Sequence, residues 1–186
     1  MSREFPDIVD PWKVADGRRS FRGTVPLKWM TRLEAMLAPE SETGTPPVVW
    51  DDASFSASFA FDRQGLVTIA IRVKAELPLV CQRSLEPYLE HVDRHSELVV
   101  IEDVAEQEAL PEQYEPVLVE ERRLALVELV EEELILAIPQ VPCSPDAGEL
   151  ELPDDVSLET SGGKEKEQTH RPFEGLSGLI KDSAGD

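Results

Sequence analysis

Cysteine, aromatic residues and long apolar segments are all scarce in this sequence. Its two cysteines, Cys81 and Cys143, are too few for a framework of disulfide bonds. No apolar run approaches the roughly 18 residues of a membrane-spanning helix, and residues 1–7 lack the apolar core of a signal peptide. These absences predict a cytoplasmic protein with reduced thiols. Aromatic residues amount to 6%, which argues against large platforms for stacking nucleic-acid bases.

The motifs of common enzyme classes are also missing. There is no glycine-rich phosphate-binding loop. With 38 acidic residues, a pair of carboxylates says nothing by itself about acid–base catalysis. A thiolate pair of Cys81 with His91 or His95 is the remaining combination, and no activating context surrounds it. We therefore expect a protein that is not an enzyme, with a small cysteine-dependent enzyme as the weakest alternative.

Positive charge is scarce as well, and it is unevenly distributed. The formal net charge is -20, from 18 basic and 38 acidic residues. Residues 84–160 hold 22 acidic and 3 basic residues, whereas residues 1–40 hold 6 acidic and 7 basic residues. Such an acidic half repels phosphate backbones and attracts basic partners. A solvated face that only keeps the protein soluble explains the same charge equally well.

Alternating apolar residues predict a β-hairpin over residues 54–77. Every second position is apolar in 55–61 and again in 67–77, on both sides of the turn Asp62-Arg63-Gln64-Gly65. One face of each strand is polar, so the sheet is expected to be antiparallel and covered on one side. Residues 20–27 and 116–119 are predicted as edge strands and 96–101 as a short strand. Residues 6–16 and 84–93 are predicted as an irregular lead-in and a turn.

Two segments have helical periodicity, and both are expected to pack on this sheet. Residues 27–38 place Met30, Leu33, Met36 and Leu37 on one stripe. Residues 124–137 place Val127, Val130, Leu134 and Ala137 on one face, with Glu128 and Glu132 on another. The predicted fold class is therefore α+β, with an antiparallel sheet built around the central hairpin and packed by two or three helices.

One domain over residues 1–143 is expected to be followed by an acidic tail. Residues 144–168 are rich in Ser, Asp, Glu, Gly and Pro, a composition typical of a disordered linker. Near 171–181 an amphipathic segment follows, with helical spacing of Phe173, Leu176, Leu179 and Ile180. This segment either folds on binding a partner groove or packs back on its own domain.

Two further sets of residues have the chemistry of binding sites. Cys81, Cys143, His91 and His95 could together supply the four ligands of a zinc ion. Two buried thiols and two surface imidazoles are the simpler interpretation, and no metal or cofactor is expected. Arg18, Arg19, Arg22, Lys28 and Arg32 form a basic cluster that could contact RNA. We favour the alternative that this cluster neutralises the acidic half of the same molecule.

Several segments, in this order and spacing, resemble the bacterial YceD family. They are Val9-Asp10-Pro11-Trp12, Phe21-Arg22-Gly23-Thr24-Val25-Pro26-Leu27, the phenylalanine-rich hairpin, Cys81-Gln82-Arg83, Ala109-Leu110-Pro111-Glu112, Tyr114-Glu115-Pro116 and Leu136-Ala137-Ile138-Pro139. The segment beginning Arg171-Pro172-Phe173 resembles the end of proteobacterial members. The resemblance covers most of the chain, and no single motif in it is specific.

The resemblance implies a role in accumulation of 23S ribosomal RNA, and so in biogenesis of the large ribosomal subunit. It supplies no catalytic residues. Many relatives have a second cysteine where this chain has Ser84, a departure that argues against zinc here. Because non-specific RNA binding relies on Lys and Arg, we expect the acidic half to dock a basic ribosomal or assembly protein. The expected contacts on the second helix are Glu128, Glu131, Glu132 and Glu133.

Overall fold

The computed structural model describes residues 5–41, 48–110 and 114–146, which lie within one compact unit, Met1–Gly148. The expected tail spans residues 144–186, and its part from residue 147 onward lies outside the described residues, including Phe173, Leu176, Leu179 and Ile180. Among the described residues, no helix has the length and apolar character needed to cross a bilayer.

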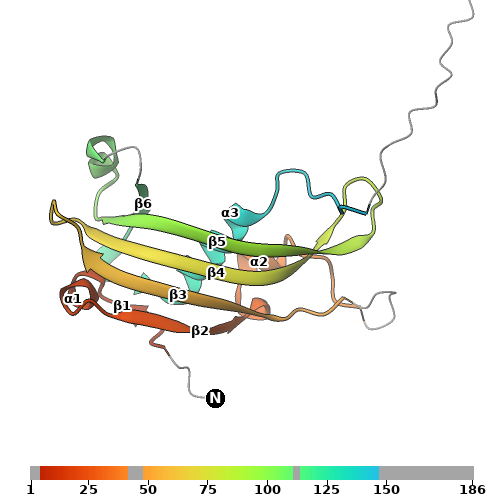
Figure 1. Ribbon diagram of the computed structural model, residues 1–186, viewed down its shortest axis with the longest axis horizontal. Helices are drawn as coiled ribbons and strands as arrows, with labels where there is room; N and C mark the ends of the chain where they lie inside the picture. The colour runs from red at the N-terminus through yellow and green to blue at the C-terminus, as the bar shows by residue number, and fades with distance from the viewer. Residues whose placement is uncertain (1–4, 42–47, 111–113, 147–186) are drawn as a thin grey trace, which may run out of the picture. The chain divides into compact units, whose positions relative to one another are not determined.

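A five-stranded sheet forms the centre of this unit, in the order β2-β3-β4-β5-β6 (Figure 1). Its strands are β2 (Ser20–Pro26), β3 (Asp52–Phe61), β4 (Val67–Val80), β5 (Pro87–Ile101) and β6 (Glu115–Leu118). All neighbouring strands are antiparallel except β5 and β6, which are parallel. The predicted α+β class is confirmed, and β2 and β6 are the two edge strands.

The predicted hairpin is β3 and β4, with Phe59 opposite Ile69. The Asp62 carboxylate closes its turn, because Oδ1 accepts hydrogen bonds from the backbone N–H groups of Gln64 and Leu66, each at 2.8 Å. Gly65 has φ of 84°, a left-handed conformation that a side chain would strain. The turn-forming residues and the period-two patterning therefore both specify a hairpin at residues 52–80.

A second long hairpin, β4 with β5, was not predicted from the sequence. Residues 84–93 were expected to form a turn, whereas β5 starts at Pro87 and pairs with β4 from Val80 to Thr68. The first half of β5 is polar on its outer face, and Leu89 is 51% exposed, so little apolar alternation is visible there. Pairing with the long strand β4 stabilises this segment where local propensity is weak.

Helices and short elements surround the sheet, and α3 lies across one of its faces (Figure 1). They are α1 (Pro11–Asp16), α2 (Thr31–Glu34), α3 (Leu126–Ala137), the two-stranded pair β1 (Ile8–Val9) and β7 (Leu124–Ala125), and the 3₁₀ turns η1 (Leu27–Trp29), η2 (Val104–Ala109) and η3 (Glu120–Arg122). The helix α3 packs on β4 and β5 and contacts α2, while α1 packs on β3 and β4.

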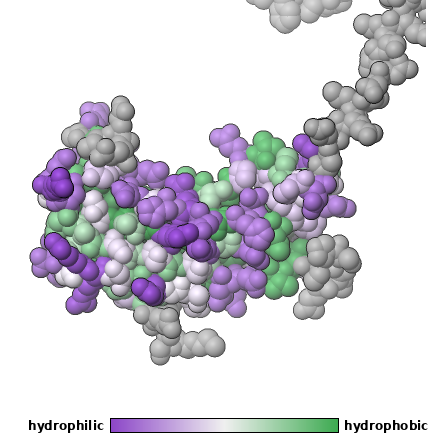
Figure 2. All heavy atoms as spheres, in the orientation of Figure 1, coloured by the Kyte–Doolittle hydropathy of each residue, from purple (hydrophilic) through white to green (hydrophobic). Residues whose placement is uncertain are grey.

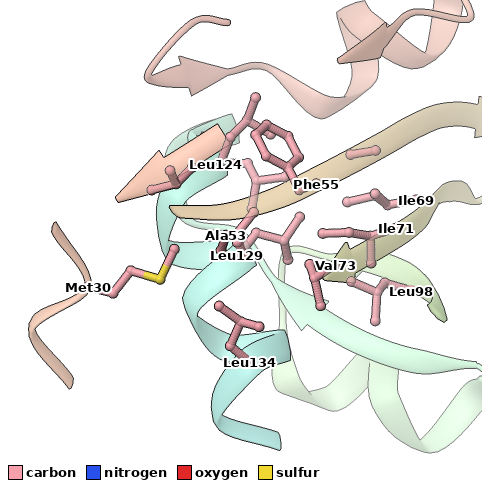
Figure 3. Close-up of a cluster of buried hydrophobic side chains, with 14 of the residues drawn as sticks. Met30, Ala53, Phe55, Ile69, Ile71, Val73, Leu98, Leu124, Leu129 and Leu134 are labelled. Atoms are coloured by element: carbon pink, nitrogen blue, oxygen red, sulfur yellow. The ribbon is translucent and has the colours of Figure 1, made fainter. Parts of the chain in front are cut away.

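The core lies between the inner face of the sheet and α3 (Figure 3). The buried residues of this interface are Phe55, Phe59, Ile69, Ile71 and Val73 from the sheet and Leu129, Val130 and Leu134 from α3. At the sheet edge, Phe5 packs edge-on against Phe55 with ring centroids 4.8 Å apart. Gly23 makes room for this contact, because a Cβ atom there would lie 2.6 Å from Phe5 Cδ1.

Two predictions near the N-terminus are wrong in detail. Residues 27–38 form the turn η1 and the short helix α2, separated by Met30, whose φ of -104° and ψ of 84° interrupt a helix. Residues 6–16, expected to be irregular, contain β1 and α1. The sequence signal for α1 was Asp10-Pro11, because Asp10 Oδ1 caps the N–H groups of Trp12 and Lys13 and proline suits the first helical position.

Candidate functional site

The four glutamates expected to contact a partner occupy two different environments on α3. Glu131 and Glu133 are buried, with 5% and 2% of their surface exposed. Glu128 is exposed, and the side chain of Glu132 is 48% exposed. Buried carboxylates are costly unless they are paired and hydrogen-bonded, so the internal partners of Glu131 and Glu133 explain their position.

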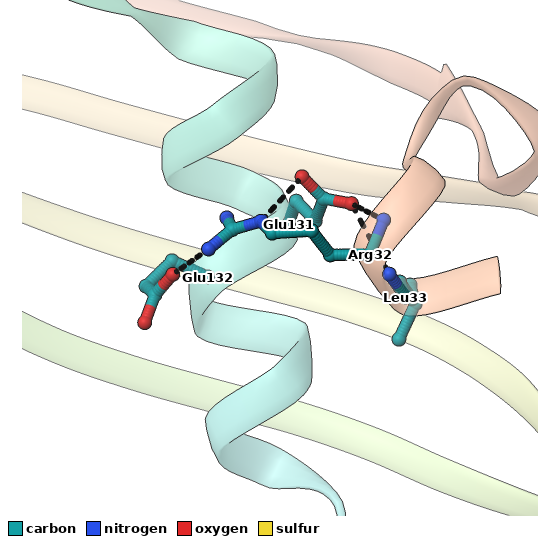
Figure 4. Close-up of polar contacts among 4 residues, drawn as sticks. All are labelled: Arg32, Leu33, Glu131 and Glu132. Atoms are coloured by element: carbon teal, nitrogen blue, oxygen red, sulfur yellow. Dashed lines mark hydrogen bonds and ion pairs between the residues drawn. The ribbon is translucent and has the colours of Figure 1, made fainter. Parts of the chain in front are cut away.

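Glu131 caps the first turn of α2 (Figure 4). Its Oε1 atom accepts hydrogen bonds from the backbone N–H of Arg32 at 2.7 Å and of Leu33 at 3.1 Å. The residue that precedes α2, Met30, supplies no side-chain cap. Arg32 also donates from Nε to Glu131 Oε2 at 3.2 Å and from Nη1 to Glu132 at 2.7 Å. The carboxylate therefore provides α2 with the N-terminal cap that its own sequence lacks.

Glu133 makes an equivalent connection from α3 to β5. Its Oε2 atom accepts hydrogen bonds from Arg94 Nε at 2.8 Å and from Ser96 Oγ at 2.6 Å. Arg94 also pairs with Glu115 of β6 at 3.2 Å. The hydrogen bond to Glu133 raises the pKa of Arg94 above its ordinary value. This ion pair holds α3 in one rotational setting above the sheet.

The prediction that all four glutamates meet a partner is therefore corrected for Glu131 and Glu133, whose carboxylates are buried and used internally. A signal for Glu133 was present in the sequence. It lies four residues after Leu129 and three after Val130, which places it within the apolar stripe of α3. Glu128 and Glu132 stay available at the surface.

A groove of about 1080 Å³ runs along α3 and is lined by residues of α3, of β6, of the η1–α2 segment and of residues 7–8. We call it the α3 groove. Exposed apolar side chains line it, namely Ile8, Trp29, Leu118 and Leu136. Glu128 and Glu132 also line it, so the two accessible glutamates of α3 border an apolar surface rather than open solvent alone. Sequence reasoning missed this groove because its residues come from five separate segments.

The predicted basic cluster is distributed over several elements of the fold. Arg32 is bound to the glutamates of α3, as the favoured interpretation expected for that residue. Lys28 lies on η1, and Arg18 and Arg19 precede β2. Arg22 lies within β2, opposite Ser56 of β3.

Arg22 belongs instead to a different basic row, which the sequence did not reveal. Strand register places Arg22, Ser56, Arg72 and His95 side by side across β2, β3, β4 and β5. Hydrophilic side chains spread over the middle of the face seen in Figure 2. Asp93 offsets part of the charge, since it binds Arg72 through two 2.7 Å hydrogen bonds, and Arg72 and Lys74 lower its pKa.

Cys81 is buried in a turn that is rich in hydrogen-bond donors. Its Sγ atom accepts hydrogen bonds from the backbone N–H groups of Arg83 and Ser84, each at 3.4 Å, and of Ser144 at 3.3 Å. The hydrogen bond from the Ser84 side chain, followed by those backbone donors, lowers the pKa of the Cys81 thiol to about 6. A further hydrogen bond, from Gln82 N to Pro142 O at 2.8 Å, brings the segment containing Cys143 to this turn.

The four weak candidates for a metal site do not come together. His91 and His95 were considered at helical spacing, but they lie on β5, where four residues span about 13 Å. His91 faces Glu76, with Nδ1 3.2 Å from the carboxylate, on the outer face of the sheet. Within the described part of the chain, no group of three or more His, Cys, Asp or Glu residues is arranged to hold a metal ion.

Comparison with known proteins identifies the family. The model of the family "Large ribosomal RNA subunit accumulation protein YceD" matches residues 69–180. A protein of that name from Haemophilus influenzae is 32% identical over 140 residues, which is 75% of this chain and 75% of the relative. The chain belongs to the YceD family. No solved structure matches it.

The YceD family match starts within β4 and runs past α3. It therefore includes Cys81 and the cluster of Arg94, Ser96 and Glu133. In this YceD family member, Ser84 occupies the position where the resemblance implies a second cysteine in many relatives. Its hydroxyl stabilises the Cys81 thiolate.

Removing the carboxylate of Glu131 should destabilise the fold far more than removing that of its neighbour. Glu131→Ala leaves two backbone N–H groups of α2 without their acceptor, and we expect a loss of about 2–4 kcal/mol in the free energy of unfolding. Glu132→Ala breaks only a solvent-exposed pair and should cost about 1 kcal/mol or less. Urea unfolding of both variants measures the difference. Equal losses would contradict the capping role.

Cys81 should titrate as a thiolate near pH 6. In a Cys143→Ser protein, ultraviolet absorbance of the thiolate should rise with a midpoint of about 6. A Cys81→Ser protein should lack this step. Because the pKa is lowered in the folded state, the associated stabilisation is fully present above the ordinary thiol pKa of 9.0 and is lost as pH falls through about 6. A midpoint at the ordinary value would refute the donor arrangement around Sγ.

Proposed function

We propose that this protein is a non-enzymatic factor in biogenesis of the large ribosomal subunit, which supports the synthesis, processing or stability of 23S ribosomal RNA in the cytoplasm. The observation that carries this proposal is membership of the YceD family, together with the name of the Haemophilus influenzae relative, a large ribosomal RNA subunit accumulation protein. The absence of a recognisable catalytic motif in the sequence agrees with a role in binding.

The proposed mode of action is docking of a basic ribosomal or assembly protein on the acidic surface of α3. The net charge of -20 favours a basic protein partner over the phosphate backbone of RNA. Glu128 and Glu132 are the accessible carboxylates of α3 and face the α3 groove. Charges at the rim of an interface chiefly accelerate association and select partners, so their reversal should impair docking without unfolding the domain.

A charge-reversal experiment tests this mode of action. Cells that lack the native gene receive either Glu128→Lys/Glu132→Lys or the control Glu106→Lys/Glu108→Lys, which changes net charge equally at exposed positions on η2. We expect only the α3 variant to reduce the level of 23S ribosomal RNA and recovery of basic proteins in a pull-down. Thermal unfolding of both purified proteins checks that they are folded. Unchanged RNA levels and recovery with the α3 variant would refute docking at α3.

Direct contact with ribosomal RNA is a second candidate function, favoured by the basic row on the outer face of the sheet. The row contains Arg22, a member of the predicted RNA-binding cluster, and Arg72. Its positive charges and the neighbouring serine hydroxyls suit phosphate contacts.

RNA crosslinking in cells distinguishes this second candidate. Arg22→Gln should lower the yield of protein crosslinked to RNA by about threefold, since one counterion-releasing contact is lost. Arg63→Gln, which removes the same charge from the exposed hairpin turn, should leave the yield unchanged. Equal crosslinking yields for the native protein and both variants would refute direct RNA contact through this face.

A further inference from the structure

The α3 groove gathers exposed apolar side chains that are otherwise scattered over the domain. Trp29, Leu118 and Leu136 are 43%, 47% and 54% exposed, and Ile8 joins them. Eleven large apolar residues are exposed in the described part of the chain, and these four line the same groove. Single exposed apolar residues are normal on a protein surface, whereas a cluster in a concavity indicates a binding site.

The charge around this apolar surface is negative. Six acidic and three basic residues line the groove. Two of the three basic residues, Arg32 and Arg94, are already bound to glutamates of the same wall. Glu128 has no ion pair among the described residues, and Glu132 and Glu115 are about half exposed. An occupant of the groove therefore meets apolar side chains flanked by carboxylates.

The walls of the groove are held in place before any partner arrives. Glu131 joins α3 to α2. Arg94 of β5 binds both Glu133 of α3 and Glu115 of β6, and so joins these three elements. The edge strand β6 pairs only with β5 within the described residues. A groove with fixed walls binds with little loss of conformational freedom, which favours affinity.

We propose that the α3 groove binds a lysine- and arginine-rich amphipathic helix of a partner protein. The apolar stripe of that helix packs on Trp29, Leu118 and Leu136, and its cations face Glu128 and Glu132. The inference rests on the proposed function, because it specifies the partner chemistry for docking at α3. An apolar stripe with flanking cations matches the lining of the groove, whereas RNA would bring phosphates to its carboxylates.

A model peptide tests the groove independently of the cell. The probe is a synthetic amphipathic peptide of about five helical turns, with leucine along one face and lysine elsewhere. Its control has the same composition with the leucines scrambled. Calorimetric titration of the full-length protein should show tighter binding of the amphipathic peptide. Equal affinity for the two peptides would mean that charge alone drives binding, and it would overturn the proposal that the α3 groove binds an amphipathic helix.

Apolar substitutions locate the binding surface. Leu118→Asn and Leu136→Asn should each weaken binding of the amphipathic peptide by about tenfold, since each removes apolar contact area from the interface. Leu89→Asn is the matched control, because Leu89 is 51% exposed on β5 and does not line the groove. All three positions are exposed, so the variants should unfold at the same temperature as the native protein. No difference among the three would overturn the proposal.

Other occupants have distinct signatures. If the native protein sediments as a dimer and Leu136→Asn converts it to a monomer, a second copy fills the groove and the proposal is overturned. If Phe173→Asp in the full chain tightens peptide binding by about tenfold or more, the C-terminal segment is the occupant instead.

The groove and the proposed function can also fail separately. If the groove binds the peptide as expected while Glu128→Lys/Glu132→Lys preserves 23S ribosomal RNA, the groove stands and the proposed docking function fails. If Glu128→Lys/Glu132→Lys lowers 23S ribosomal RNA while Leu118→Asn and Leu136→Asn leave peptide binding unchanged, the docking function stands and the groove is overturned.

Discussion

The arrangement of this domain depends on two buried carboxylates of one helix. Glu131 supplies the cap that α2 lacks, and Glu133 binds Arg94 and Ser96 of β5. Apolar contacts alone permit a helix to slide or rotate on a sheet at small cost, whereas a buried carboxylate tolerates only the position in which its partners are met. These two residues therefore define where α3 lies, and with it the walls of the α3 groove.

The parts of the fold that were predictable are those specified by neighbouring residues. The hairpin of β3 and β4 followed from period-two patterning, and α3 followed from its apolar stripe. The first half of β5 was missed because its stability comes from pairing with β4 rather than from its own composition. The division of residues 27–38 into η1 and α2 was missed for a related reason, since the cap of α2 is supplied by distant Glu131.

The candidate site was predictable only in its overall charge. Sequence reasoning identified the acidic helix, and the place of Glu133 within the apolar stripe was a signal that it is structural. The role of Glu131 could not be predicted, because its partners belong to the distant segment α2. The basic row was hidden for another reason. Arg22, Arg72 and His95 are far apart in the chain and become neighbours only through the register of four strands. Register of this kind is a property of the assembled sheet.

The cap on α2 also sets an order for folding during synthesis. Arg32 and Glu131 are separated by 99 positions, and β1 likewise pairs with β7 near the start of α3. Until the segment containing α3 has left the ribosome, the parts of β4 and β5 on which α3 packs remain uncovered. A topology with such distant contacts folds slowly and leaves apolar surface accessible in the nascent chain. The domain therefore completes its native structure only after its final third, which contains β7 and α3, has been synthesised.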